Sequence, residues 1–275
     1  MTATVEGTQG LNDADQADAI ARAFVDARNA GGALPDYPGR MPATLDEGYR
    51  VQARAIARDG RRIAGWKVGK IPDHLVQAFG NNRLAGPIFD DQVVDFDGTA
   101  PEMPMFAEGF GAGEAEYLLR IGSLPEPGKA SFTNEEAAAH VDEIRVGIEV
   151  ASSPFPGIND HGPAVTVSDF GNNNGLVLGT ILPRETHFLE WKVALTIDGE
   201  VAGEASAATM LDGPFGAVRF LFELAAERGL PLAPGQWIST GAVTGVHSVR
   251  PGQRVEAIFD GRFTVACTIG KAGAR

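Results

Sequence analysis

Two glutamates, Glu114 and Glu116, stand two residues apart in the segment Gly113-Glu-Ala-Glu-Tyr-Leu-Leu-Arg120. Side chains alternate faces along a strand, so a strand here places both carboxylates on one face. Glu149 lies in the apolar run Arg145-Val-Gly-Ile-Glu-Val150, and buried acidic residues are usually paired or bound to a metal. Three such carboxylates would form an oxygen cage that suits Mg²⁺ or Mn²⁺. On spacing alone, however, the glutamate pair is more typical of a solvent-facing strand.

A lysine stands between two glycines in the apolar segment Gly65-Trp-Lys-Val-Gly69. Glycines allow a ligand to approach the backbone closely. Lys67 could therefore bind a substrate carboxylate, or transfer protons if burial lowers its pKa. A surface lysine at the end of a strand explains the spacing equally well.

A polar loop enters an apolar strand in Val167-Ser-Asp-Phe-Gly-Asn-Asn-Asn-Gly-Leu176. Asp169 and Asn172 are its candidates for binding a substrate, and the neighbouring asparagines offer further hydrogen-bonding groups. Taken alone, the segment is more typical of an Asx-rich turn.

The elements that must position these residues follow from periodicity and turn signals. Helices are expected at residues 12–30, 44–59, 137–144 and 214–228. Strands are expected at 65–69, 88–96, 115–121, 146–151, 176–182, 191–197, 236–240, 254–259 and 263–269, with Asp-Gly hairpin turns at 198–199 and 260–261.

This pattern predicts an α+β fold with a mainly β body behind a helical N-terminal portion. We expect the helical portion at residues 1–60 and the catalytic body at 61–275, either as two parts or as one continuous domain. Residues 1–10 lack the basic and apolar regions of a signal peptide and are expected to be a flexible leader.

Composition limits the class of partner. The formal net charge of −13 argues against nucleic acid and anionic membrane surfaces. The single cysteine, Cys267, lies in an apolar run, where a small core residue is expected. With one cysteine no disulfide can form within the chain, which is consistent with a reducing cytoplasm.

Taken in order, these segments resemble one family. The Gly-Trp-Lys-Val-Gly, Glu-Ala-Glu and Gly-Ile-Glu-Val segments and the loop ending at Gly179 follow one another as in the 2-keto-4-pentenoate hydratases of the fumarylacetoacetate hydrolase superfamily. The segments at residues 203–214 and 232–244 fit too, and the resemblance spans residues 45–270. It shifts the balance for the glutamates from a surface strand to a metal site.

The resemblance implies a mixed β-roll body that binds one Mg²⁺ or Mn²⁺. It implies that the metal ligands are Glu114, Glu116 and Glu149. Lys67 matches the family's active-site lysine, and Asp169 matches an acidic residue close to the metal. Asn172 stands where the family often has a serine that helps to hold the substrate carboxylate.

The resemblance also implies a lyase of aromatic catabolism that hydrates 2-hydroxy-2,4-dienoates through a metal-bound enolate. The expected partners are a small 2-oxo acid substrate and further copies of the chain in a homo-oligomer. A complex with a partner decarboxylase or hydratase is an alternative assembly. The charge of the metal would offset the acidity of the chain toward an anionic substrate.

Two segments depart from the family pattern. Ser152-Ser-Pro154 stands where hydratases often have Asp-Ser-Arg, and Arg83-Leu-Ala-Gly-Pro-Ile88 stands where an acidic residue often precedes the second strand. The metal ligands are intact, but the outer substrate contacts differ. Decarboxylation of a 4-oxalocrotonate-type acid, carbon–carbon hydrolysis of an acylpyruvate and dehydration of a sugar-derived 2-oxo acid therefore remain alternatives. A metal-binding subunit without activity of its own is the non-enzymatic alternative.

Overall fold

A mixed sheet forms the centre of the molecule in the computed structural model, which describes residues 13–183 and 186–275. Its strand order is β2-β1-β10-β5-β6-β7-β3, with β11 paired to β5. The strands are β1 (Ile63–Lys70), β2 (Arg83–Phe89), β3 (Val93–Asp95), β5 (Phe110–Ile121), β6 (Val141–Ser153), β7 (Asn173–Leu182), β10 (Trp237–Ser239) and β11 (His247–Ser248). Strands β1 and β10 pair in parallel, as do β3 and β7, and the other pairs are antiparallel.

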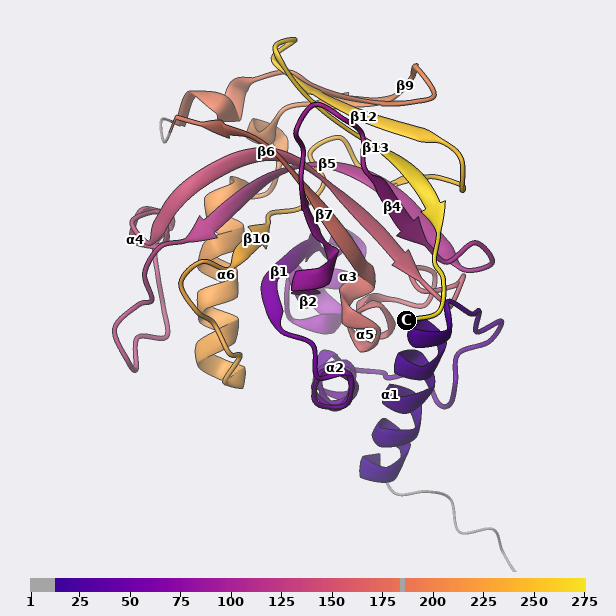
Figure 1. Cartoon of the computed structure of the whole chain (residues 1–275). Coiled ribbons are helices and arrows are strands. Elements are labelled where there is room, and N and C mark those ends of the chain that lie inside the picture. Colours follow the sequence, from indigo (N-terminus) through magenta and orange to yellow (C-terminus); the bar gives the residue numbers. More distant parts are fainter. Residues whose placement is uncertain (1–12, 184–185) are drawn as a thin grey trace, which may run out of the picture.

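A second sheet of five strands packs across one face of the first (Figure 1). Its order is β4-β13-β12-β8-β9, made of β4 (Glu102–Met105), β8 (Val193–Ile197), β9 (Glu200–Ala205), β12 (Arg254–Phe259) and β13 (Phe263–Lys271). Both predicted Asp-Gly hairpins are confirmed, because Asp198–Gly199 and Asp260–Gly261 take the positive φ values that tight hairpin turns need. The predicted core cysteine, Cys267, is buried in this sheet.

Helices lie mainly on the other face of the large sheet, where α1, α2 and α5 lie together in Figure 1. The helices are α1 (Asp13–Ala30), α2 (Leu45–Asp59), α3 (Asp73–Phe79), α4 (Asn134–Ala138), α5 (Pro163–Ser168) and α6 (Gly213–Arg228). Short 3₁₀ turns are η1 (Asp90–Gln92), η2 (Phe170–Asn172), η3 (Thr186–Glu190) and η4 (Ala207–Thr209). The predicted helices at 12–30, 44–59 and 214–228 are confirmed, and the predicted cap at Thr44 accepts a hydrogen bond from the Glu47 amide. No helix of the described residues is long and apolar enough to cross a membrane.

Two local predictions are wrong. The predicted helix at 137–144 ends at Ala138, because Val141 already begins β6 and pairs with β5. The capping box at Thr133 and Glu136 is real, so its presence marked where the helix starts but not how far it runs. The predicted strand at 88–96 is interrupted by η1, which separates β2 from β3.

The α+β prediction is confirmed, with both sheets sharing one large hydrophobic core. Helices α1 and α2 contribute Phe24 and Val51 to a buried cluster that also contains Phe89, Phe155 and Phe170 from beyond residue 60. The helical portion thus packs directly onto the β body, and a domain boundary near residue 60 stays a prediction. The predicted leader at residues 1–10 lies outside the described residues.

Candidate metal centre and active site

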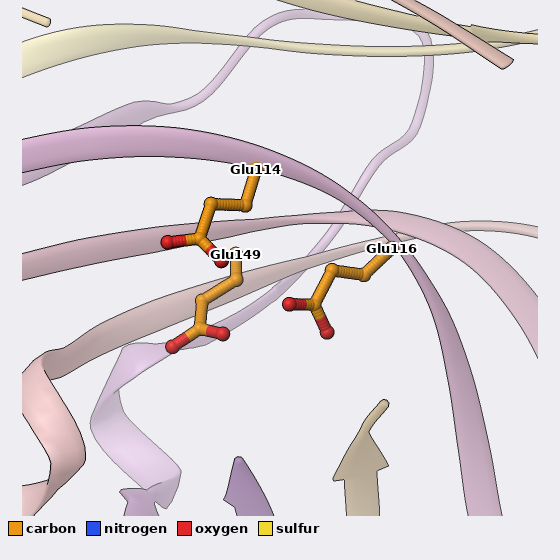
Figure 2. A group of neighbouring side chains, drawn as sticks. All are labelled: Glu114, Glu116 and Glu149. Carbon is orange, nitrogen blue, oxygen red and sulfur yellow. The ribbon is translucent and has the colours of Figure 1, made fainter. Parts of the chain in front are cut away.

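Three glutamates meet on the central strands of the large sheet. Glu114 of β5 stands directly opposite Glu149 of β6, and Glu116 lies two residues along β5 on the same face. Each residue offers a carboxylate oxygen within 4.8 Å of the others (Figure 2). The solvent-facing alternative is wrong, because β5 lies between β10 and β6 and the three residues are almost completely buried.

The electrostatics of this cluster favour a bound cation. Burial, and next the neighbouring Glu149 carboxylate, raise the pKa of Glu114 to about 8. Burial and the carboxylates of Glu149 and Glu114 also raise the pKa of Glu116 well above its usual value, although Ser239 and Gly241 donate hydrogen bonds to Glu116. Buried carboxylates are costly unless they are paired or coordinate a metal.

One oxygen of the cluster is left without a hydrogen-bond donor. Glu116 Oε1 is buried and has no partner in the part of the chain that the structure describes. Buried polar atoms are nearly always paired, and carboxylate oxygens are the preferred ligands of Mg²⁺ and of other hard cations. The donor set, the spacing and the unpaired oxygen therefore fit a divalent metal ion at Glu114, Glu116 and Glu149.

Lys67 of β1 joins the cluster. Its Nζ lies 3.7 Å from Glu149 Oε1 and donates a hydrogen bond to Asn172 Oδ1 at 3.1 Å. Burial lowers the pKa of Lys67, but the carboxylates of Glu149, Glu114 and Glu116 raise it more, so the net shift is upward. Lys67 is thus a buried cation, and its interpretation as a surface lysine is wrong.

The asparagine loop also reaches the cluster. Besides accepting from Lys67, Asn172 donates through Nδ2 to Asn159 Oδ1 at 3.0 Å. Asn173 donates through Nδ2 to Glu149 Oε1 at 2.8 Å. The predicted residues Lys67, Glu114, Glu116, Glu149 and Asn172 therefore come together in one place.

Asp169 does not turn toward the cluster. Its carboxylate accepts hydrogen bonds from Arg28 at 2.6 and 2.9 Å and from Ser153 Oγ at 2.6 Å. The side chain is completely buried, and among the described residues it is not part of the cavity lining. Its predicted catalytic role stays a prediction.

A cavity of about 700 Å³ leads from the cluster to the surface. Its inner end contains Lys67, Glu114 and Asn172. Apolar side chains line much of the remaining wall: Leu75, Leu84, Met210, Leu211, Val243 and Val246. The two other cations on the wall are already paired, Lys70 with Asp73 at 2.9 Å and Arg83 with Asp212.

The sequence analysis missed three residues of this site. Ser239 and Asn159 contact Glu116 and Asn172 respectively, and Arg28 reaches the loop from α1. Ser239 stands inside the C-terminal segment that carried the resemblance, so that segment was the available signal. Nothing in the spacing of Asn159 or Arg28 distinguishes them from surface residues.

The structure accounts for the two departures from the family pattern. Ser152 Oγ donates to the Phe110 carbonyl and accepts from the Phe106 amide, while Ser153 binds Asp169. The Ser-Ser pair thus ties the end of β6 to its neighbours. Arg83 lies on the cavity wall, where its pairing with Asp212 holds it.

Comparisons with known proteins give a consistent result. No family model matches the chain. The chain is 26% identical to the 2-keto-4-pentenoate hydratase of Paraburkholderia xenovorans (strain LB400) over 253 residues, covering 90% of this chain and 92% of that protein. It is 32% identical to a 4-oxalocrotonate decarboxylase of Pseudomonas putida over 255 residues, covering 91% of this chain and 94% of that protein.

Solved structures agree on the fold. The 4-oxalocrotonate decarboxylase of Pseudomonas putida G7, complexed with magnesium and adipate, matches 95% of this chain and 100% of its own with a TM-score of 0.76 at 22% identity. A fumarylpyruvate hydrolase from Pseudomonas aeruginosa, in complex with Mn²⁺ and pyruvate, covers 76% of this chain and 90% of its own, with a TM-score of 0.55 at 18% identity.

Proposed function

The chain belongs to the 2-keto-4-pentenoate hydratase family of the fumarylacetoacetate hydrolase superfamily, and from this premise we propose that it hydrates 2-hydroxy-2,4-dienoates with Mg²⁺ or Mn²⁺ as cofactor. The observation that carries the proposal is the buried carboxylate cluster with Lys67 at the inner end of a largely apolar cavity. An anionic head group can bind there, and an uncharged tail fits the wall.

The residues divide the work. Glu114, Glu116 and Glu149 would hold the cation, which supplies Lewis-acid stabilisation of negative charge on the 2-oxo group of the substrate. Lys67 and Asn172 lie beside the metal ligands, where they can orient the substrate carboxylate. The buried walls exclude bulk water from the reacting diene, so few water molecules compete for it.

Hydration requires proton movement as well as charge stabilisation. Ketonisation removes the proton of the 2-hydroxyl group and places a proton on the far end of the diene. This leaves an alkene conjugated to the ketone, and water then adds to the alkene carbon farther from the ketone. We assign these proton transfers to Lys67, because its Nζ lies at the inner end of the cavity beside Glu149.

Decarboxylation of a 4-oxalocrotonate-type acid is the second candidate. It is favoured by the 32% identity to a decarboxylase and by the TM-score of 0.76 to another. The apolar wall would suit this reaction too, since a carboxylate in an apolar surrounding is destabilised relative to neutral carbon dioxide. The two candidates share the head-group site and differ in the substrate tail.

The test is direct. The purified protein, loaded with Mg²⁺, is incubated with 2-hydroxypenta-2,4-dienoate while the dienol absorbance and the appearance of the 4-hydroxy-2-oxo acid are followed. The proposal predicts loss of the absorbance with equimolar product. Turnover restricted to a 4-oxalocrotonate-type acid, with release of carbon dioxide, would reject hydration in favour of the second candidate.

Two variants test the assigned roles. Lys67→Met should abolish turnover while Mn²⁺ binding persists, since the three carboxylates remain. Glu200→Gln, an exposed position in β9, is the matched surface control and should behave as the wild type. Full activity of Lys67→Met would contradict the role given to the lysine.

A further inference from the structure

Arg28 of α1 extends into the protein interior beneath the asparagine loop. A guanidinium has five N–H donors in a fixed planar arrangement. Arg28 Nε and Nη2 donate to the two carboxylate oxygens of Asp169, and Nη2 also donates to the Ser152 carbonyl. Nη1 donates to the Asn173 carbonyl and to Asn174 Oδ1, both at 3.2 Å. One side chain therefore grips both ends of the loop between residues 169 and 174.

The loop that Arg28 grips has a backbone conformation that needs support. Phe170, Gly171 and Asn172 follow one another with φ of 54°, 61° and 60°, all in the left-handed region. Non-glycine residues adopt this region rarely and at a cost. The guanidinium carbon of Arg28 also lies 5.1 Å from the ring centre of Phe170, within reach of a cation–π contact.

The strained turn controls what faces the carboxylate cluster. It directs Asn172 Oδ1 to Lys67 and Asn173 Nδ2 to Glu149. The loop backbone packs against Gly86 of β2 so closely that a Cβ at this glycine would overlap the Phe170 carbonyl. The position of the turn is thus fixed by the sheet on one side and by Arg28 on the other.

We propose that Arg28, acting through Asp169, is a positioning residue for the active site: it holds the left-handed turn that orients Lys67 and Glu149. The proposal rests on the proposed function, because it treats these two residues as substrate-binding and metal-binding groups. It assigns a role in the site to a helix that precedes all of the motifs that carry the chemistry. Asp169 then contributes without touching the substrate.

Three variants of Arg28 separate charge from geometry. Arg28→Lys keeps the charge but lacks the planar set of donors that reaches both ends of the loop. Arg28→Met removes both. Ile20→Ala, buried on the same helix and without a recorded contact to the loop, is the control for loss of stability alone. All measurements are made at a temperature at which each variant remains folded.

The first readout needs no activity. Hydrogen exchange of the amides at residues 170–174 should accelerate strongly in both Arg28 variants but not in Ile20→Ala. The second readout is Mn²⁺ binding followed by titration. The Mn²⁺ dissociation constant should rise roughly 10- to 100-fold in Arg28→Met, the usual effect of losing a residue that orients a metal ligand. Arg28→Lys should lie between Arg28→Met and the wild type.

The outcomes are distinct. If wild-type protein binds neither Mn²⁺ nor oxalate, a 2-oxo acid analogue, the proposed function fails and the loop exchange alone decides the inference. If the wild type binds both, and Arg28→Met keeps wild-type exchange and wild-type Mn²⁺ binding, Arg28 is only a core residue and the inference is overturned. Equal effects in Arg28→Met and Ile20→Ala would overturn it as well.

Discussion

Two clusters of buried charge lie on either side of the turn at residues 170–172, and they are built in opposite ways. Around Arg28 and Asp169, the guanidinium donors and the carboxylate oxygens all have partners within the chain. Around Glu116, three carboxylates share Lys67 as their nearest cation, and one oxygen has no donor among the described residues. Burial is similar in both clusters.

The difference shows how to distinguish a structural charge from a functional one. A buried charge whose partners are complete fixes the backbone, and removing one partner exposes the cost of burying the other. A buried cluster whose charge is not balanced within the chain is unstable alone and gains stability from a ligand that balances it. Exposure and residue type alone would not have separated the two clusters.

The largest expected effect is loss of turnover in Glu149→Gln. Removing a ligand of the cation should lower kcat/KM by about a thousandfold or more, since the metal contributes several kcal/mol of charge stabilisation. The same change relieves repulsion with Glu114 and Glu116, so the free energy of unfolding in chelator should stay equal or increase. Steady-state kinetics and urea unfolding in EDTA measure the two effects. A clear loss of stability in EDTA would show that the cluster is balanced without a ligand.

The Arg28–Asp169 pair should respond in the opposite sense. Arg28→Met leaves Asp169 buried and unpaired, which should lower the free energy of unfolding by about 3–5 kcal/mol in either the presence or the absence of metal. The double variant Arg28→Met/Asp169→Leu should recover part of this loss, because no uncompensated charge remains. Urea unfolding of the four proteins completes the cycle. Purely additive losses would contradict the interpretation as a coupled pair.

The carboxylate cluster should make stability depend on pH when metal is removed. The folded-state pKa of Glu114 is about 8, above its usual value of 4.5, so the folded state keeps a proton that the unfolded state loses. Stability in EDTA should therefore be highest below pH 4.5 as far as this group is concerned, and should decline as pH rises toward 8. Saturating Mg²⁺ should flatten the decline. Melting temperatures at pH 5 and pH 8, with EDTA or Mg²⁺, test this, and Glu149→Gln should reduce the slope.

The sequence could predict the unbalanced cluster better than the balanced one. Glu114 and Glu116 alternate along a strand, and Glu149 is marked by its apolar neighbours, so local pattern placed all three on strands. The strand register that sets Glu149 opposite Glu114 is a property of the sheet, and the resemblance supplied it indirectly. Arg28 carries no such mark, because its partners are 124 to 146 residues away along the chain.

The failed local predictions have the same origin. The Thr133–Glu136 capping box is a local signal and was read correctly, whereas the short length of α4 is decided by pairing between β6 and β5. Likewise, the left-handed turn at Phe170–Asn172 depends on contacts with Arg28 and Gly86, which the asparagine-rich segment does not encode. Distant contacts override local propensity at both positions.

Two serines sharpen the comparison at the smallest scale. Ser153 Oγ donates to Asp169 and Ser239 Oγ donates to Glu116, and both serines are fully buried. Ser153→Ala should lower the free energy of unfolding by about 1–3 kcal/mol and leave Mn²⁺ binding unchanged, because it removes one donor from a complete network. Ser239→Ala should do the reverse. Its hydroxyl lowers the pKa of Glu116, so its loss raises that pKa further and should weaken Mn²⁺ binding roughly tenfold, with little change in stability in EDTA. Similar profiles for the two variants in parallel Mn²⁺ titrations and urea unfolding would mean that the two clusters do not differ in kind.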